Sequence, residues 1–324
     1  MLPPELQQGI EAFLENIDLK TLKAARESTS ADYRKGADSH HTFQNRSQLL
    51  SYLVTRLPAT YGAALQVFGQ MQERLPNQPI RSLIDLGAGP GSATWAALDV
   101  FPDLQQLFLF EREFQVIEVG KKLSALSAHP AWKEAQWQES SLDSLTLPKA
   151  DLAVLSYVIA EIPFYSQLIH RLFESEISFI AIIEPGTPAG FERIRSIRAI
   201  AIQQKWNIVA PCPHLFSCPM KEGHWCHFAA RIERSRLHRQ LKEGALGYED
   251  EKYSYLILGK DPLPPLEGRV VGTPHKASGH VRLPLCAADG KLKEIIISRR
   301  EKSIYKKARK AEWGTAWPPC KAEM

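Results

Sequence analysis

The cysteines are the residues of this chain whose type and spacing most directly suggest chemistry. Four of the five form a candidate set of metal ligands: Cys212, Cys218, Cys226 and Cys286. Five residues separate the first two and seven the next two, so the C-x2–4-C pair that opens zinc fingers and ribbons is absent. This wide spacing, with proline after Cys212 and Cys218, is better suited to an iron–sulfur cluster held by four thiolates.

The segment around the first three cysteines, residues 211–228, is rich in proline, glycine and histidine and cannot build much apolar core. A bound metal would supply folding energy here, so simple buried thiols are the less favoured interpretation. Zinc stays open as an alternative to iron–sulfur, with His214, His224 or His227 as substitute ligands. The fifth cysteine, Cys320, lies in a polar tail and is expected to be free.

A glycine loop is the second motif, and it runs from Asp85 through Gly87 and Gly89 to Gly91. Glycine permits tight turns and lets a ligand approach the backbone. The G-x-G-x-G spacing differs from the dinucleotide fingerprint G-x-G-x-x-G, and the Gly-Lys-Ser/Thr of a P-loop is absent. With an acidic residue two places before the first glycine, the loop resembles motif I of methyltransferases that use S-adenosylmethionine (SAM).

An acidic residue, Glu111, ends the next apolar run. Doubly wound nucleotide sites bind ribose hydroxyls with a carboxylate at this position. The loop and the acid, one helix length apart, together favour a ligand that contains a nucleoside. Ser141 and Leu142 fall where an adenine-contacting loop is expected, and Ser156 follows the third apolar run on the substrate side. Tyr157 is equally well explained by packing.

The catalytic residues beside this pocket stay unassigned. Methyltransferases that modify the amino groups of bases commonly carry Asn/Asp/Ser-Pro-Pro-Tyr after this strand, where the chain has Ser156-Tyr157-Val158-Ile159. Carbon-5 cytosine methyltransferases need a cysteine nucleophile, and no cysteine lies between residues 1 and 211. The sequence therefore predicts a cofactor pocket without a recognisable catalytic group.

Two regions of the chain must position these motifs. Residues 1–78 show apolar residues at helical spacing and predict an N-terminal helical region. Residues 79–260 carry short apolar runs separated by helix-length segments, which is typical of buried parallel strands in an α/β fold. These runs lie at 82–86, 107–110, 152–155, 179–183 and 253–258.

Residues 261–324 follow a proline-rich linker and predict a basic C-terminal extension. Strand-like runs at 268–272, 280–285 and 292–297, the last two joined by an Asp-Gly turn, predict a small sheet or an OB-like barrel followed by a helix. Residues 291–310 contain nine Lys/Arg against two Glu, an excess larger than the net charge of +4 of the whole chain.

This basic segment and a second one after the cysteines predict a surface that contacts RNA phosphates without reading sequence. The second segment, expected on a helix, contains Arg231, Arg234, Arg236, His238, Arg239 and Lys242. Tyr305, Trp313 and Trp317 are candidates for base stacking, with core packing an equal alternative.

The composition is that of an ordinary folded protein, with 44% hydrophobic and 23% charged residues among 324. No stretch approaches the ~20 apolar residues that cross a bilayer, so no membrane partner is expected. The acidic N-terminus lacks the pattern of a signal or transit peptide, and we expect a cytoplasmic protein, with a monomer favoured. Disulfides are disfavoured in the cytoplasm, which again favours cysteine ligands over bridges.

The chain resembles the methyltransferase-like assembly factors of the mitochondrial small ribosomal subunit and their bacterial relatives. The resemblance covers most of the chain, and its main stretches are DLGAGPGSATWA, SYVIAEIP, IEPGTPAGF and, most specifically, APCPHLFSCPMKEGHWCHFAARIERSRLHRQLK. It implies a class I methyltransferase fold, SAM bound at the glycine loop and Glu111, and a [4Fe–4S] cluster on the four cysteines. It also implies small-subunit ribosomal RNA or a pre-ribosomal particle as the partner, and the absent presequence favours the bacterial branch.

The function predicted on this basis is that of a SAM-dependent methyltransferase for ribosomal RNA. The alternative is a non-catalytic RNA-binding assembly factor that uses a methyltransferase fold. A radical-SAM enzyme is disfavoured, because the C-x3-C-x2-C motif of that class is missing.

Overall fold

The computed structural model describes residues 1–15, 17–35, 45–143 and 145–317. Four helices form the N-terminal region, as predicted: α1 (Pro4–Phe13), α2 (Leu19–Lys35), α3 (Arg46–Thr55) and α4 (Leu57–Arg74). Pro58 lies in the first turn of α4, where its missing N–H costs nothing, so the proline is compatible with this helix. No helix in the described residues is long and apolar enough to cross a membrane.

The central element is an eight-stranded sheet with strand order β3-β2-β1-β4-β5-β8-β6, in which β7 also pairs with β8. Its strands are β1 (Ser82–Leu86), β2 (Gln106–Glu111), β3 (Gln136–Glu139), β4 (Ala150–Ser156), β5 (Ile177–Pro185), β6 (Asn207–Ala210), β7 (Phe228–Glu233) and β8 (Tyr248–Gly259). The first five strands pair in parallel, and β8 runs antiparallel to β5 and β6. This doubly wound arrangement confirms the predicted class I methyltransferase-type, Rossmann-like fold.

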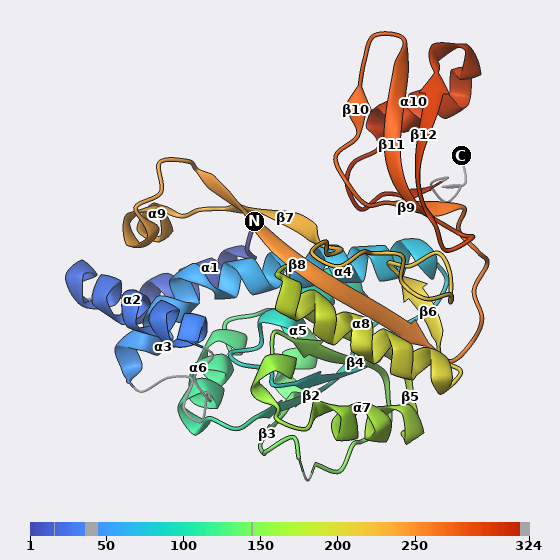
Figure 1. The fold of residues 1–324 in the computed structure, drawn as a ribbon. Helices are drawn as coiled ribbons and strands as arrows, with labels where there is room; N and C mark the ends of the chain where they lie inside the picture. The colour runs from blue at the N-terminus through green and yellow to red at the C-terminus, as the bar shows by residue number, and fades with distance from the viewer. Residues whose placement is uncertain (16, 36–44, 144, 318–324) are drawn as a thin grey trace.

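Helices cover both faces of this sheet (Figure 1). They are α5 (Ser92–Val100), α6 (Phe114–Ser124), α7 (Tyr165–Glu174) and α8 (Pro188–Gln203). Alternate strand residues face opposite layers, as Leu83 packs in the cluster with α4 and α5 while Ile84 packs in the cluster with α7 and α8. The N-terminal helices thereby complete one layer of the core.

The C-terminal unit forms a separate lobe beside the large sheet (Figure 1). Of the predicted sheet or barrel, the structure has a five-stranded sheet with strand order β10-β11-β9-β13, and β12 pairs with β11. Its elements are β9 (Gly268–Val270), β10 (His275–Lys276), β11 (His280–Ala287), β12 (Leu292–Ser298), α10 (Lys302–Lys310) and β13 (Ala316–Trp317). Trp317 is buried in the core of this unit, which favours packing over base stacking, whereas Cys320 lies outside the described residues.

Candidate functional site

The glycine loop joins β1 to α5 in a backbone conformation that needs glycine. The φ angles of Gly87, Gly89 and Gly91 are 73°, 56° and 89°, which is the left-handed region. A Cβ on Gly87 would lie 2.4 Å from a methyl group of Val158, whereas a Cβ on Gly89 would meet, among the described residues, only the Tyr52 hydroxyl at 3.9 Å. The loop is therefore closed beneath Gly87 and open above Gly89, where a ligand can approach.

Glu111 lies at the carboxyl end of β2, as predicted, and is locked to the loop. Its carboxylate accepts hydrogen bonds from the backbone N–H of Gly89 at 2.9 Å, of Arg112 at 2.9 Å and of Glu113 at 3.0 Å. Burial raises the pKa of Glu111, and these backbone donors oppose the rise. The free lone pairs of the carboxylate are thus held in a fixed position beside the loop.

Asp85 lies beneath the loop and not at its surface. Its side chain is 1% exposed and accepts a hydrogen bond from the Thr94 hydroxyl at 2.7 Å. Burial raises the pKa of Asp85 to about 7, and the charge of Glu111 adds to the rise. Its Oδ1 atom has no hydrogen-bond partner within the described part of the chain.

The other predicted contact residues differ in position. Ser156 ends β4 at the same edge of the sheet as the loop, and its hydroxyl is buried with no partner among the described residues. The Ser141 hydroxyl bonds the nearby Asp143 carboxylate at 3.1 Å on an exposed loop. The Leu142 side chain is buried in the core, so only its backbone is available to a ligand.

A polar network that the sequence did not reveal lies at this edge, where Tyr157 directly follows Ser156 of β4. The Arg56 guanidinium makes two hydrogen bonds of 3.1 Å with the Glu251 carboxylate, and the Tyr157 hydroxyl donates to the same carboxylate at 3.0 Å. Burial, and then the charge of Glu251, keeps the pKa of Tyr157 well above its ordinary value, so the phenol stays a donor. The positive φ of Tyr157, 59°, is a backbone strain that sequence alone does not disclose.

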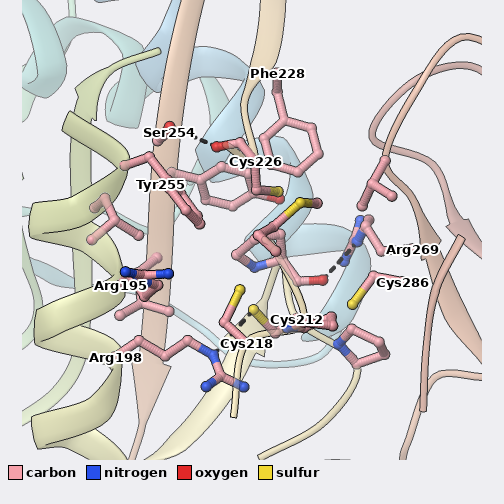
Figure 2. A pocket seen from close by; sticks show the side chains of 18 of the residues that line it. Arg195, Arg198, Cys212, Cys218, Cys226, Phe228, Ser254, Tyr255, Arg269 and Cys286 are labelled. Carbon is pink, nitrogen blue, oxygen red and sulfur yellow. Dashed lines mark hydrogen bonds between the residues drawn. The ribbon is translucent and has the colours of Figure 1, made fainter. Parts of the chain in front are cut away.

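The four predicted cysteine ligands line one pocket, and Figure 2 shows Cys286 on the side opposite Cys212 and Cys218. Cys212 and Cys218 lie in the loop after β6, Cys226 lies just before β7, and Cys286 lies in β11. The pocket therefore joins the large sheet, the cysteine-rich segment and the C-terminal unit. All four cysteines are free thiols, and no group of three or more His, Cys, Asp or Glu side chains in the described residues is arranged to hold a metal ion.

Burial and neighbouring negative charge both oppose ionisation of these thiols. Burial, and then the negative charges of Cys212 and Cys218, raises the pKa of Cys286 to about 12. Of the three histidines considered as alternative ligands, His214 also lines the pocket, with its Nε2 3.3 Å from Cys286 Sγ. His224 is exposed, and His227 stacks with Trp225.

The structure corrects the expectation that the whole basic segment after the cysteines lies on a helix. Arg231 lies in strand β7, and Arg234 lies in the loop before the short helix α9 (Arg236–Lys242). Both arginines are paired with carboxylates of β8, Arg231 with Asp250 at 2.9 Å and Arg234 with Glu249 at 2.7 Å. Lys242 also pairs with Glu249 at 2.7 Å and His238 is 1% exposed, so acidic residues of β8 pair with Arg231, Arg234 and Lys242, whereas Arg236 and Arg239 of α9 are exposed.

A family profile described as mitochondrial small ribosomal subunit Rsm22 matches residues 46–318. The chain belongs to the Rsm22 family. The matched range includes the glycine loop, Glu111 and all four cysteines of the pocket, so both sites lie within the part of the chain that defines the family.

Two relatives of this Rsm22 family chain are ribosome assembly proteins. The human mitochondrial ribosome assembly protein METTL17 is 24% identical over 99% of this chain and 76% of that protein. The mitochondrial ribosome assembly protein RSM22 of Saccharomyces cerevisiae is 25% identical over 43% of this chain and 38% of that protein. The chain thus spans well under half the length of the yeast relative.

Among solved structures, the plantazolicin methyltransferase BpumL in complex with a pentazolic desmethylPZN analog and SAH is similar over 75% of this chain and 98% of that chain. The identity is 13% and the TM-score 0.43.

Proposed function

We propose that this Rsm22 family member binds SAM and an iron–sulfur cluster and acts on, or assembles, the small ribosomal subunit through its RNA. The observation that carries the proposal is the family match over residues 46–318, because one range contains both candidate sites. The relatives named as ribosome assembly proteins support the ribosomal part.

The cofactor part rests on the glycine loop and Glu111. The open side of Gly89, the Glu111 carboxylate and the partnerless hydroxyl of Ser156 fit an adenosyl ligand with hydrogen-bonding ribose hydroxyls. SAM supplies an electrophilic methyl group when bound. The Glu111 carboxylate and the backbone at Gly89 would orient that ligand.

The metal part rests on the chemistry of the donor set. Four thiols from three segments line one pocket, and thiolates are the ligands of both [4Fe–4S] clusters and structural zinc. We favour the cluster because of the wide spacing and the Cys-Pro steps, and zinc with His214 is the alternative. Anaerobically purified protein should contain iron and sulfide; stoichiometric zinc without iron would reject the cluster.

The decisive experiment for catalysis is transfer of a labelled methyl group from SAM to small-subunit RNA in a precursor particle. The rRNA methyltransferase proposal predicts incorporation that is lost in Gly89→Val. The matched control is Gly69→Ala, which lies in helix α4 and has open space around its Cβ. Binding of the particle without any incorporation would contradict catalysis and leave an assembly factor.

A non-catalytic assembly factor is the second candidate, and the Arg56–Glu251–Tyr157 network favours it. Tyr157 of this network directly follows β4, the position expected for residues on the substrate side, and its hydroxyl is already bonded to Glu251. Arg56→Met combined with Tyr157→Phe would remove its bonds. If the network blocks a site that is otherwise able to catalyse transfer, methyl incorporation should rise in this variant. Incorporation equal to that of the wild type would favour the non-catalytic role.

The remaining parts of the proposal concern the setting of the protein. We propose a member of the bacterial branch that works in the cytoplasm as a monomer, as expected from the sequence. Fractionation of cells and light scattering of the purified chain test these points directly.

A further inference from the structure

Two buried arginines line the cysteine pocket, and neither has a carboxylate partner in the described residues. Arg198 of helix α8 is 5% exposed, and Arg269 of strand β9 is 1% exposed. Burying a guanidinium without a counter-charge is costly, so such groups normally pair with an acid. The acid whose charge reaches Cys286, Asp289, is exposed and paired with Lys293 at 2.6 Å.

Arg198 is aimed at the thiol side of the pocket. Its Nε donates to Cys212 Sγ at 3.3 Å, and its Nη2 donates to the backbone oxygens of His214 at 2.9 Å and Phe216 at 2.8 Å. These bonds hold the loop that carries Cys212 and Cys218 against helix α8. All of these acceptors are formally neutral while the thiols are protonated.

Arg269 approaches the pocket from the opposite side (Figure 2). It donates to the backbone oxygens of Pro211 at 2.9 Å and Gly314 at 2.8 Å, and to the side chain of Gln70. Its Nη2 is buried and has no partner among the described residues. One guanidinium therefore connects α4, the cysteine-rich segment and the C-terminal unit while keeping a hydrogen-bond donor unused.

We propose that Arg198 and Arg269 are the counter-charges of the cysteine site, which they stabilise in its thiolate, metal-loaded form. This inference rests on the proposed metal site. Four thiolates around a core of charge 2+ keep a net charge of 2−, whether the core is zinc or an oxidised [4Fe–4S] cluster. Two buried guanidiniums balance that charge, and Arg198 adds a hydrogen bond to one ligand sulfur.

As positioning and charge-balancing residues, Arg198 and Arg269 should influence the reduction potential of the cluster, which residues with a purely structural role would not. Net charge and hydrogen bonds to the sulfurs set the reduction potential of an iron–sulfur cluster. Loss of a nearby positive charge disfavours the more negative, reduced state. Arg198→Met and Arg269→Met should therefore shift the potential to more negative values, and Arg269→Lys, which keeps the charge, should shift it less.

The test measures iron and sulfide content and the midpoint potential of anaerobically purified full-length variants. Arg195→Met is the matched control: Arg195 lies one turn earlier on α8 and lines the same pocket, but it is 2.7 Å from Glu192 and its side chain is 42% exposed. We expect it to shift the potential least. If Arg269→Met does not fold, Arg198→Met and Arg269→Lys decide the matter.

Unchanged potentials in iron-loaded Arg198→Met and Arg269→Met would overturn the counter-charge role. If the wild type holds zinc, the same variants are compared by chelator competition, and both should release zinc several-fold faster than Arg195→Met; equal release overturns the role. A wild type that binds neither metal contradicts the proposed metal site itself, an outcome separate from a loaded wild type with unaffected variants.

Discussion

The glycine-loop pocket and the cysteine pocket are organised in opposite ways. In the first, neighbouring strands and their connecting loop make all the defining contacts, such as the bonds from the backbone of Gly87 and Ala88 to the Phe110 oxygen. In the second, three thiols come from residues 212–226 and the fourth from the distant strand β11, and buried arginines bond backbone oxygens of the cysteine-rich segment. Loss of the ligand should therefore leave the first pocket folded and loosen the second.

The largest effect is expected at the cysteine pocket. Cys226→Ser should abolish metal binding and lower the free energy of unfolding by several kcal/mol, on the order of what a structural metal contributes. SAM affinity should change little, because the glycine loop is built locally. Metal analysis, thermal unfolding and calorimetry measure these three quantities.

The control for this substitution is Cys320→Ser, at the cysteine expected to be free. Full metal content in Cys226→Ser would show that this thiol is not a ligand. A parallel loss of SAM affinity would show that the two pockets are coupled, which would break the comparison.

At the glycine loop, Gly89→Val should abolish SAM binding while the protein stays folded. The φ of 56° costs a β-branched residue roughly 1–2 kcal/mol, and the new side chain fills the side from which the ligand approaches. Calorimetry with SAM and thermal unfolding check both parts. In contrast, Gly69→Ala in helix α4 should stabilise the fold by about 0.5–1 kcal/mol and leave SAM affinity unchanged.

The acid beneath the loop gives a prediction about pH. Because the folded-state pKa of Asp85 is raised from 3.8 to about 7, the folded protein binds the extra proton between these values and loses stability as pH rises through them. Asp85→Asn keeps an acceptor for Thr94 but does not ionise, so its stability should not fall as the pH rises through this range. The free energy of unfolding of the variant should exceed that of the wild type by about 4 kcal/mol above pH 7 and match it near pH 4.

Denaturant unfolding of the two proteins between pH 4 and 8 measures this difference. A constant difference across that range would show that Asp85 titrates normally. The pocket would then be more hydrated than its burial indicates.

The smallest expected effect is on the salt dependence of RNA binding, and it distinguishes the basic segment at α10 from the one at β7. Lys306 and Lys307 of α10 are exposed and form no ion pair within the described residues, whereas Arg231 is paired with Asp250. If RNA binds α10, each lysine-to-alanine change should reduce the slope of log affinity against log salt by about 1. Arg231→Ala should leave the slope unchanged. RNA binding at several salt concentrations measures the slope, and a reversed order would place the RNA on β7.

Much of the fold followed from short apolar runs, but three strands of the large sheet did not. β3 is mostly polar and exposed, and β6 is only four residues long, so neither gives a clear apolar run. β7 alternates between buried and exposed residues, and its exposed arginine led to the prediction of a helix. The strand became recognisable only through its pairing with β8 and the carboxylates there.

The sequence by itself determined the glycine loop, Glu111 and the identity of the four cysteines, because backbone conformation and short-range hydrogen bonds follow from residue type and spacing. The tertiary structure alone decided that Cys286 lines the same pocket as the other thiols, that Arg198 and Arg269 face this pocket, and that Arg56, Tyr157 and Glu251 form a network. These contacts depend on strand order and on how the C-terminal unit packs, and the physical forces that set them act between residues far apart in the chain.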